Sequence, residues 1–257
     1  MTAISTAPSV TYPASRHRIT KVMRLHLVNR LTYIGIPWII TGVALIVSIV
    51  VALLIVAASV PGADRQQALE GMGYSWAVLS PLWYLAVVGV QAVSAVFPFA
   101  MSFSITRREY ALGTLLTYLV IAAFNAAGWA ILTEIERAIN ASGVVFHHCT
   151  ALWLADVGVG TVWLSLFSLQ VLIFAVTSAF AAVYARWRAM GMLVLWVAVA
   201  LVVLGLIAIA VLTGAAPPLI EWLIGLPTAS FFAALLIPAA LAFGLGWGAL
   251  RGASLRG

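Results

Sequence analysis

The sequence predicts an all-α integral membrane protein with six transmembrane helices, and three observations lead to that fold class. First, 64% of the 257 residues are hydrophobic and only 8% are charged, whereas about 25% of residues are charged in soluble domains. Second, the mean hydropathy is +1.13, and apolar runs reach the roughly 20 residues that a helix needs to cross a bilayer. Third, the alternating pattern of transmembrane strands is absent from the sequence.

Six apolar segments define the predicted spans. They cover residues 33–59, 81–103, 111–133, 159–185, 191–213 and 228–250. Residues 1–15 are rich in Ser, Thr, Ala and Pro, so we expect a disordered tail before a single transmembrane domain at 16–257. A cleaved signal peptide is not expected, because the first apolar run starts only near Tyr33 and is longer than a signal h-region.

The distribution of charge predicts that both ends of the chain lie in the cytoplasm. Eleven of the thirteen Lys and Arg residues, and only one of the seven acids, fall in the tails and connections on one side of the predicted spans. Lys and Arg gather on the cytoplasmic side of membrane proteins. A nucleic-acid partner is not expected, because no basic cluster is interleaved with aromatic residues.

Residues 16–31 precede the first span and can form a basic amphipathic helix. Ile19, Val22, Met23 and Leu27 fall on one side of that helix. We expect it to lie along the inner leaflet, with its Lys and Arg side chains attracted to anionic lipid. The alternative is a basic flank that serves only to orient the first span.

A built turn is predicted between the second and third spans, at residues 104–112. Thr106 and Glu109 have the spacing of a capping box, in which each satisfies a backbone N–H of the other. Pro98 lies shortly before this turn, where its missing N–H should kink the incoming helix.

Two further connections carry signals. The sequence Arg186-Trp187-Arg188 predicts a tight inner turn, with the tryptophan at the level of the lipid headgroups. On the other side, residues 214–227 hold three prolines around an apolar piece too short to span. That piece can enter the outer leaflet as a re-entrant element.

Several kinds of chemistry are missing from the sequence. Lys21 is the only lysine and follows no Gly-rich stretch, so this chain has no P-loop for ATP. Every carboxylate falls in a loop or at a helix end, which argues against a self-sufficient ion-coupled carrier. With no Gly-x-Ser-x-Gly motif and no intramembrane histidine, we expect no enzymatic activity from this chain alone.

One cluster has residue types that bind metals. His147, His148 and Cys149 are consecutive, and Asp156 follows, but the spacing matches no standard zinc pattern. We therefore expect a polar loop with no metal. Cys149 is the only cysteine, so no internal disulfide can form.

Three polar residues within the spans are candidates for a translocation path: Gln91, Ser94 and Asn125. Gln91 and Ser94 sit one turn apart on the helix that leads into the 104–112 turn. The alternative role for such residues is hydrogen bonding between helices.

A family resemblance rests on three short segments: FPFA at 97–100, TRREY at 106–110 and LGT at 112–114. They resemble segments of the membrane subunit of ABC-2 type ABC transporters, in particular of its actinobacterial permeases. The resemblance implies a type V exporter-like permease half in the bacterial cytoplasmic membrane. It would pair with a second copy of itself or a homologous permease, and with two ATPase subunits that hold ATP and Mg.

The resemblance also implies roles for particular residues. The coupling helix that contacts the ATPase would be Thr106, Arg107, Arg108, Glu109 and Tyr110, and a smaller second contact would be Arg186, Trp187 and Arg188. The pathway would lie between two permease chains. Because the fifth span is almost wholly aliphatic, we expect an amphipathic or hydrophobic cargo such as a drug, lipid or peptide.

Two other functions remain open at this point. One is an ATPase-independent carrier, or a substrate-binding membrane subunit of an uptake system. The other is a membrane protein that anchors or regulates a partner without transport.

Overall fold

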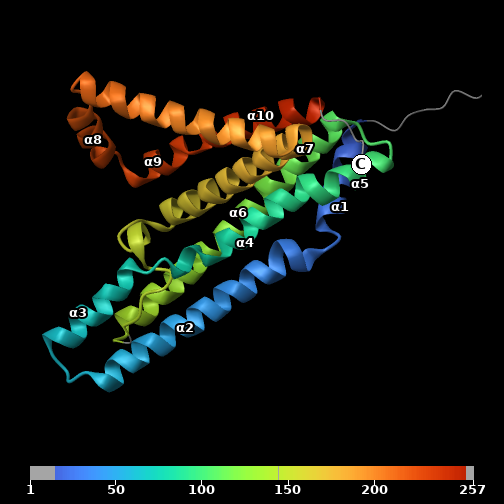
Figure 1. Ribbon diagram of the computed structural model, residues 1–257. Coiled ribbons are helices and arrows are strands. Elements are labelled where there is room, and N and C mark those ends of the chain that lie inside the picture. The colour runs from blue at the N-terminus through green and yellow to red at the C-terminus, as the bar shows by residue number, and fades with distance from the viewer. Residues whose placement is uncertain (1–14, 144, 253–257) are drawn as a thin grey trace, which may run out of the picture.

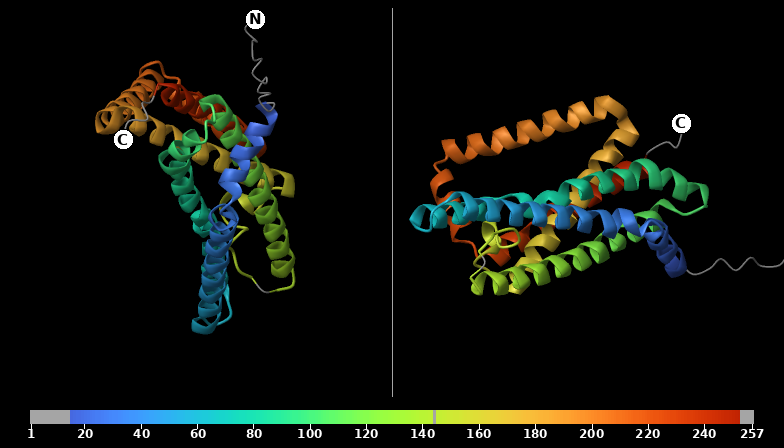
Figure 2. Two further views of the ribbon diagram at one scale, coloured as in Figure 1. Left: turned by 90° about the vertical axis from the view of Figure 1, so that its right-hand side faces the viewer. Right: turned by 90° about the horizontal axis from the view of Figure 1, so that it is seen from below.

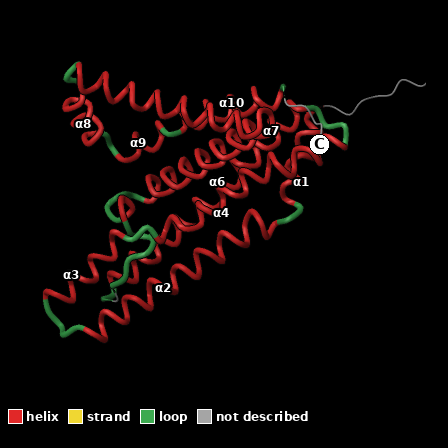
Figure 3. Tube along the Cα trace, viewed as in Figure 1, coloured by secondary structure: helices red, strands yellow, loops and turns green. Residues whose placement is uncertain are grey.

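The computed structural model describes residues 15–143 and 145–252, and this part of the chain is helical throughout its regular structure, with no strand (Figures 1 and 3). The predicted tail, apart from Ser15, lies outside the described residues. The longer elements are α1 (Ser15–Leu27), α2 (Ile36–Ala58), α4 (Ser80–Gln91), α6 (Arg107–Ala141), α7 (Val159–Leu212) and α10 (Leu236–Arg251). The shorter ones are η1 (Leu31–Gly35), α3 (Ala63–Gly71), η2 (Met72–Tyr74), η3 (Ala77–Leu79), η4 (Ala92–Val96), α5 (Phe97–Ser102), η5 (Leu152–Leu154), α8 (Ala216–Gly225) and α9 (Thr228–Ala234).

Five helical stretches are long and apolar enough to cross a membrane. They are Leu31–Ala58, Ala63–Ser102, Arg107–Ala141, Val159–Leu212 and Thr228–Gly252. Each predicted span falls within one of these stretches or overlaps it almost completely, and the expected all-helical membrane character agrees with this arrangement.

Helix α7 accounts for two of the predicted spans. Its backbone leaves helical geometry at Arg188, where φ is 56° and ψ is −149°, and beyond that point the ribbon doubles back (Figures 1 and 2). We call residues 159–187 the first limb of α7 and residues 189–212 the second limb. The break falls within the turn that the Arg-Trp-Arg sequence predicts.

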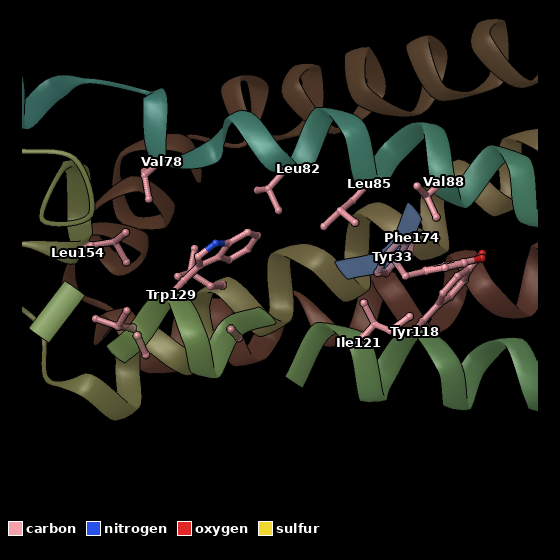
Figure 4. Close-up of a cluster of buried hydrophobic side chains, with 14 of the residues drawn as sticks. Tyr33, Val78, Leu82, Leu85, Val88, Tyr118, Ile121, Trp129, Leu154 and Phe174 are labelled. Carbon is pink, nitrogen blue, oxygen red and sulfur yellow. The ribbon is translucent and has the colours of Figure 1, made fainter. Parts of the chain in front are cut away.

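The core lies between α4, α6 and the first limb of α7 (Figure 4). Tyr118 of α6 stacks on Phe174 of α7, with ring centroids 4.4 Å apart, and donates to or accepts from Ser178 over 2.6 Å. Gly89 of α4 lies so close to Thr177 that a Cβ at that glycine would overlap the hydroxyl oxygen. Such close packing of small residues holds helices together within lipid, where burial of apolar surface supplies little drive.

The predicted kink region before the 104–112 turn contains a π-helical turn, η4. This turn sits between α4 and α5, and Pro98 occupies the first turn of α5, where a missing N–H costs least. In η4 the carbonyl of Ala92 accepts the N–H of Phe97, five residues ahead. The π turn therefore lets the helix re-form directly at the proline.

The second limb of α7 stands apart from the rest of the bundle (Figure 2). None of the residues in its most apolar window is buried. It leads through Gly214, which has a φ of 69°, into the ten-residue helix α8. Helix α8 is too short to span a membrane, and its re-entrant placement stays a prediction.

Candidate functional site

One end of the molecule gathers α1, the corner at residues 104–112, the break in α7 and the last turn of α10 (Figure 1). We call it the basic end, because Lys and Arg residues gather there, among them Arg18, Lys21, Arg24, Arg107, Arg108, Arg186, Arg188 and Arg251. The opposite end, which we call the acidic end, holds α3, α8 and the loop at 142–158.

The corner contains the predicted capping box. Thr106 is the N-cap of α6, its Oγ1 accepts the backbone N–H of Glu109 at 3.2 Å, and the Glu109 carboxylate accepts the N–H of Thr106 at 2.9 Å. Helix α6 then continues without interruption for 35 residues. Since the box fixes the first turn, the corner and α6 form one rigid piece.

Helix α1 braces this corner. The Arg18 guanidinium lies 3.8 Å from the Glu109 carboxylate. One turn further along, fully buried Val22 packs on Gly113, where an added Cβ would approach the Val22 Cβ to 2.5 Å. The α1 face that we expected to be apolar is thus turned at Val22 toward α6, and contact of this helix with anionic lipid stays a prediction.

Sequence reasoning missed His26 as a site residue. It is buried between two hydroxyl groups: its Nδ1 lies 2.7 Å from Tyr33 Oη and its Nε2 lies 3.0 Å from Thr114 Oγ1. Burial lowers the pKa of His26 to about 4, so the ring is neutral at physiological pH. Its position could have indicated burial, because residues four apart lie on the same helical face and Val22 belongs to the face that we expected to be apolar.

The predicted coupling residues of the 104–112 corner differ in their exposure to solvent. Thr106 and Arg108 are exposed, whereas Arg107 and Glu109 are half-buried. Tyr110 is buried: its hydroxyl donates to the Ala92 carbonyl oxygen and its ring meets Phe97 edge-on, with centroids 5.2 Å apart. Tyr110 therefore anchors the corner to the π turn and does not present its ring at the surface.

Two of the predicted coupling arginines reach α10. Arg107 donates to the carbonyl oxygen of Leu250, and Arg186 Nη1 donates to that of Gly248 at 3.3 Å. The Arg186 guanidinium also lies over the Trp187 ring, 4.3 Å from its centroid. The structure thus brings both predicted contact elements to one end of the molecule and joins each of them to the same helix.

The three translocation candidates are not brought together. Gln91 and Ser94 are exposed, whereas Asn125 is fully buried inside the bundle. The Asn125 side chain donates to Gln170 Oε1 at 3.3 Å and accepts from Trp38 Nε1 at 3.2 Å. These contacts link α6 to α7 and α2, which is the interhelical role that we considered as the alternative.

A cavity that the sequence did not indicate lies between α4 and the first limb of α7. Its volume is about 510 Å³, within the usual range of ligand pockets. It is lined by Trp76, Leu79, Leu82, Trp83, Ala86, Trp153, Leu169, Leu172, Ile173, Val176 and Thr177. The Thr177 hydroxyl donates to the Ile173 carbonyl oxygen at 2.7 Å, so the surface of the cavity is mainly apolar and aromatic.

At the acidic end, the Glu136 carboxylate fastens the 142–158 loop to α6. It is buried and accepts the backbone N–H groups of His148, Cys149 and Thr150 at 2.7–2.9 Å, as well as the Thr150 hydroxyl at 2.6 Å. His148 Nδ1 lies 3.1 Å from Ser48 Oγ on α2. One carboxylate thereby fixes residues 148–150 of a loop that the sequence only marked as polar.

This loop also contains the metal-binding residue types noted in the sequence. Among the residues that the structure describes, no group of three or more His, Cys, Asp or Glu is placed to hold a metal ion. Burial lowers the pKa of His148 against the opposing effect of Glu136, and burial together with Glu136 raises the pKa of the Cys149 thiol. The thiol is therefore protonated and poorly nucleophilic at neutral pH.

Comparisons with known proteins supply no family for this geometry. No family model matches the chain, and no curated protein or solved structure shows significant similarity to it.

Proposed function

We propose that this chain is the permease subunit of an ABC-2 type exporter in a bacterial cytoplasmic membrane. Two permease chains line the pathway, and two separate ATPase subunits, which bind ATP and Mg, drive them. The basic end, which holds α1 and the last turn of α10, faces the cytoplasm. The cargo is amphipathic or hydrophobic.

The observation that carries the proposal is the rigid corner at the basic end. The capping box makes the corner continuous with α6, Arg18 of α1 braces it, and Tyr110 ties it to the π turn. A flexible connection would absorb a push from an ATPase. A corner fastened at three points passes the push to a 35-residue helix, which acts as a lever through the bundle.

Six spans follow if the two limbs of α7 cross the bilayer separately. At about 1.5 Å per residue each limb is longer than the ~30 Å hydrocarbon core. The Arg188 break then lies beside the 104–112 corner on the cytoplasmic side. The two arginines around Trp187 favour this placement, because Lys and Arg gather in cytoplasmic connections. An even number of spans keeps both termini on that side.

The apolar surfaces support the proposed dimer and cargo. The second limb of α7 exposes large side chains all round, including Trp196, Leu201 and Leu204. Lipid covers such a helix on one side and a second permease chain covers it on the other. The 510 Å³ cavity opens among tryptophan and aliphatic side chains and suits a cargo with an apolar body.

Co-purification tests the proposal. The chain is expressed with the genes that flank its own, and we expect an ATPase subunit to be retained through extraction and affinity purification. Arg108→Glu should abolish retention, because Arg108 is the exposed arginine of the 104–112 corner, whereas Arg107 and Glu109 also hold the corner together. The matched control is Asp156→Lys, a charge reversal in the loop at the acidic end, which should leave retention unchanged.

Transport assays separate the proposal from its alternative. In liposomes, export of a fluorescent hydrophobic amine should require the ATPase subunit and ATP. Uptake by the isolated chain under an ion gradient without ATP, or the failure of any ATPase to bind, would overturn the proposal in favour of an independent carrier.

A further inference from the structure

The last turn of α10 receives arginines from two corners that are far apart in the sequence. Arg107 comes from the 104–112 corner and donates to Leu250 O, and Arg186 comes from the break in α7 and donates to Gly248 O at 3.3 Å. The final carbonyl groups of a helix lack partners within it and carry a partial negative charge. A guanidinium group donates hydrogen bonds to these carbonyl groups, and its positive charge is favourable beside their partial negative charge.

The end of α10 is shaped to leave room for one of these arginines. Gly252 has a φ of −104°, so this glycine is not needed for the left-handed conformation that commonly ends helices. Its N–H bonds to Ala249 O at 3.2 Å, one residue short of the α-helical partner, Gly248 O. That carbonyl is the one that Arg186 contacts.

The missing side chain at Gly252 makes this contact sterically feasible. A Cβ there would lie 2.4 Å from Arg186 Cζ and 2.6 Å from its Nη1. The guanidinium also lies over the Trp187 ring. Gly252 therefore provides the space in which the Arg186 guanidinium lies.

Beneath the arginines the same three regions meet in one apolar cluster. Tyr110 comes from the corner, Phe97 from α5 just before it, Ala182 from the first limb of α7, and Leu250 from α10. Packing keeps the helix ends adjacent. Arg107 then fixes the orientation of the 104–112 corner relative to α10, and Arg186 fixes that of the α7 break.

We propose that the last turn of α10 is a junction that makes the 104–112 corner and the α7 break move as one body, with Arg107 and Arg186 as positioning residues. The inference rests on the proposed function only in taking the corners as the places where the ATPase acts. A push on the 104–112 corner then reaches α7 and α10 directly, and the second corner needs no separate drive.

Pulsed electron paramagnetic resonance on the full chain in lipid nanodiscs tests the junction. Spin labels are placed at the exposed positions Arg108→Cys and Ala189→Cys, and native Cys149 is buried and stays unlabelled. We expect one narrow distance distribution. In Arg186→Ala, and equally in Gly252→Ala, it should broaden and gain a population at longer distance.

A control and a double variant make the test specific. Gly244→Ala adds the same methyl group to α10 where no atom lies within 4 Å, and it should leave the distribution narrow. Because the Gly252→Ala methyl acts only through the guanidinium, it should add nothing in an Arg186→Ala background. An unchanged distribution in Gly252→Ala, or full additivity of the two substitutions, would overturn the junction.

The outcome is separable from the fate of the proposed function. The distance measurement uses no ATPase, so a junction that loosens as described stands even if no ATPase co-purifies. The converse outcome is an ATPase that is retained while the distance distribution stays narrow in both Arg186→Ala and Gly252→Ala. That result would contradict the junction and leave the proposed function intact.

Discussion

His26 ties the stability of the basic end to pH. Its pKa is lowered from 6.5 to about 4 by burial, so between these values the unfolded chain binds a proton that the folded chain does not. Stability is therefore retained above about pH 6.5 and is lost as the pH falls toward 4. At about 1.4 kcal/mol per pKa unit, the full loss is about 3 kcal/mol.

Thermal unfolding of the detergent-solubilised chain at pH 7.5 and pH 5 checks this expectation. The melting temperature should fall at the lower pH, and His26→Gln should flatten the dependence while lowering stability at pH 7.5. An equal pH dependence in the two proteins would show that other groups, such as His148, account for it.

The backbone at Arg188 stores strain that glycine would relieve. With φ at 56° and ψ at −149°, it occupies a region that costs a residue with a side chain about 1–3 kcal/mol. Arg188→Gly should therefore raise the melting temperature relative to Arg188→Ala, which removes the same charge and keeps the strain. Equal melting temperatures for the two variants would contradict the geometry of the break.

At the scale of elements, the contact of α1 with α6 depends on the absence of a side chain at Gly113. An added Cβ would lie 2.5 Å from Val22 Cβ and 3.1 Å from the carbonyl oxygen of Ile19, and backbone cannot give way as a flexible side chain can. Gly113→Ala should destabilise the protein by about 1–3 kcal/mol. It should also speed tryptic cleavage at Lys21, because α1 is displaced.

Gly160→Ala is the matched control for this prediction. It adds the same group to the first turn of α7, where nothing lies within 4 Å, and should change neither quantity. Unchanged cleavage in Gly113→Ala would mean that α1 does not depend on this close approach.

Residues 148–150 of the loop at the acidic end depend on the charge of Glu136. Glu136→Gln replaces a carboxylate that accepts three N–H groups and a hydroxyl with an amide whose NH₂ faces donors. Hydrogen bonds to a charged group are each worth about 1.5–3 kcal/mol, so we expect a loss of about 3 kcal/mol and faster amide hydrogen exchange at residues 148–150. Glu134→Gln, a change at a half-exposed side chain, should leave that exchange slow.

At the scale of the whole molecule, the most apolar window of α7 is 0% buried, against 17% for the stretch Leu31–Ala58, and we propose that a second chain covers the second limb of α7. A cysteine introduced at Leu204 should form a disulfide-linked dimer under mild oxidation in membranes, since native Cys149 is buried. A cysteine at Leu54 of α2 should not, although both side chains are 62% exposed. Cross-linking at Leu54 alone, or at neither position, would place the second copy elsewhere.

The features that could be predicted from the sequence are those encoded locally. The capping box needs only Thr106 and Glu109, three residues apart, and the break in α7 follows from charges inside an apolar run. The cavity, the neutral His26 and the Glu136 clamp depend on residues brought together by the fold. Asn125 illustrates the limit: its amide suits a pathway or an interhelical bond, and only the position of Gln170 distinguishes them.

The π turn between α4 and α5 can also be regarded as a helix that has absorbed one surplus residue. Such a turn displaces carbonyl groups from their usual alignment, and here the Ala92 carbonyl serves both the Phe97 amide and the Tyr110 phenol. In a bilayer every main-chain polar group needs a partner. The buried side chains of η4 are hydrocarbon and cannot form hydrogen bonds. The peptide backbone of this stretch nevertheless accepts a hydrogen bond from the Tyr110 side chain.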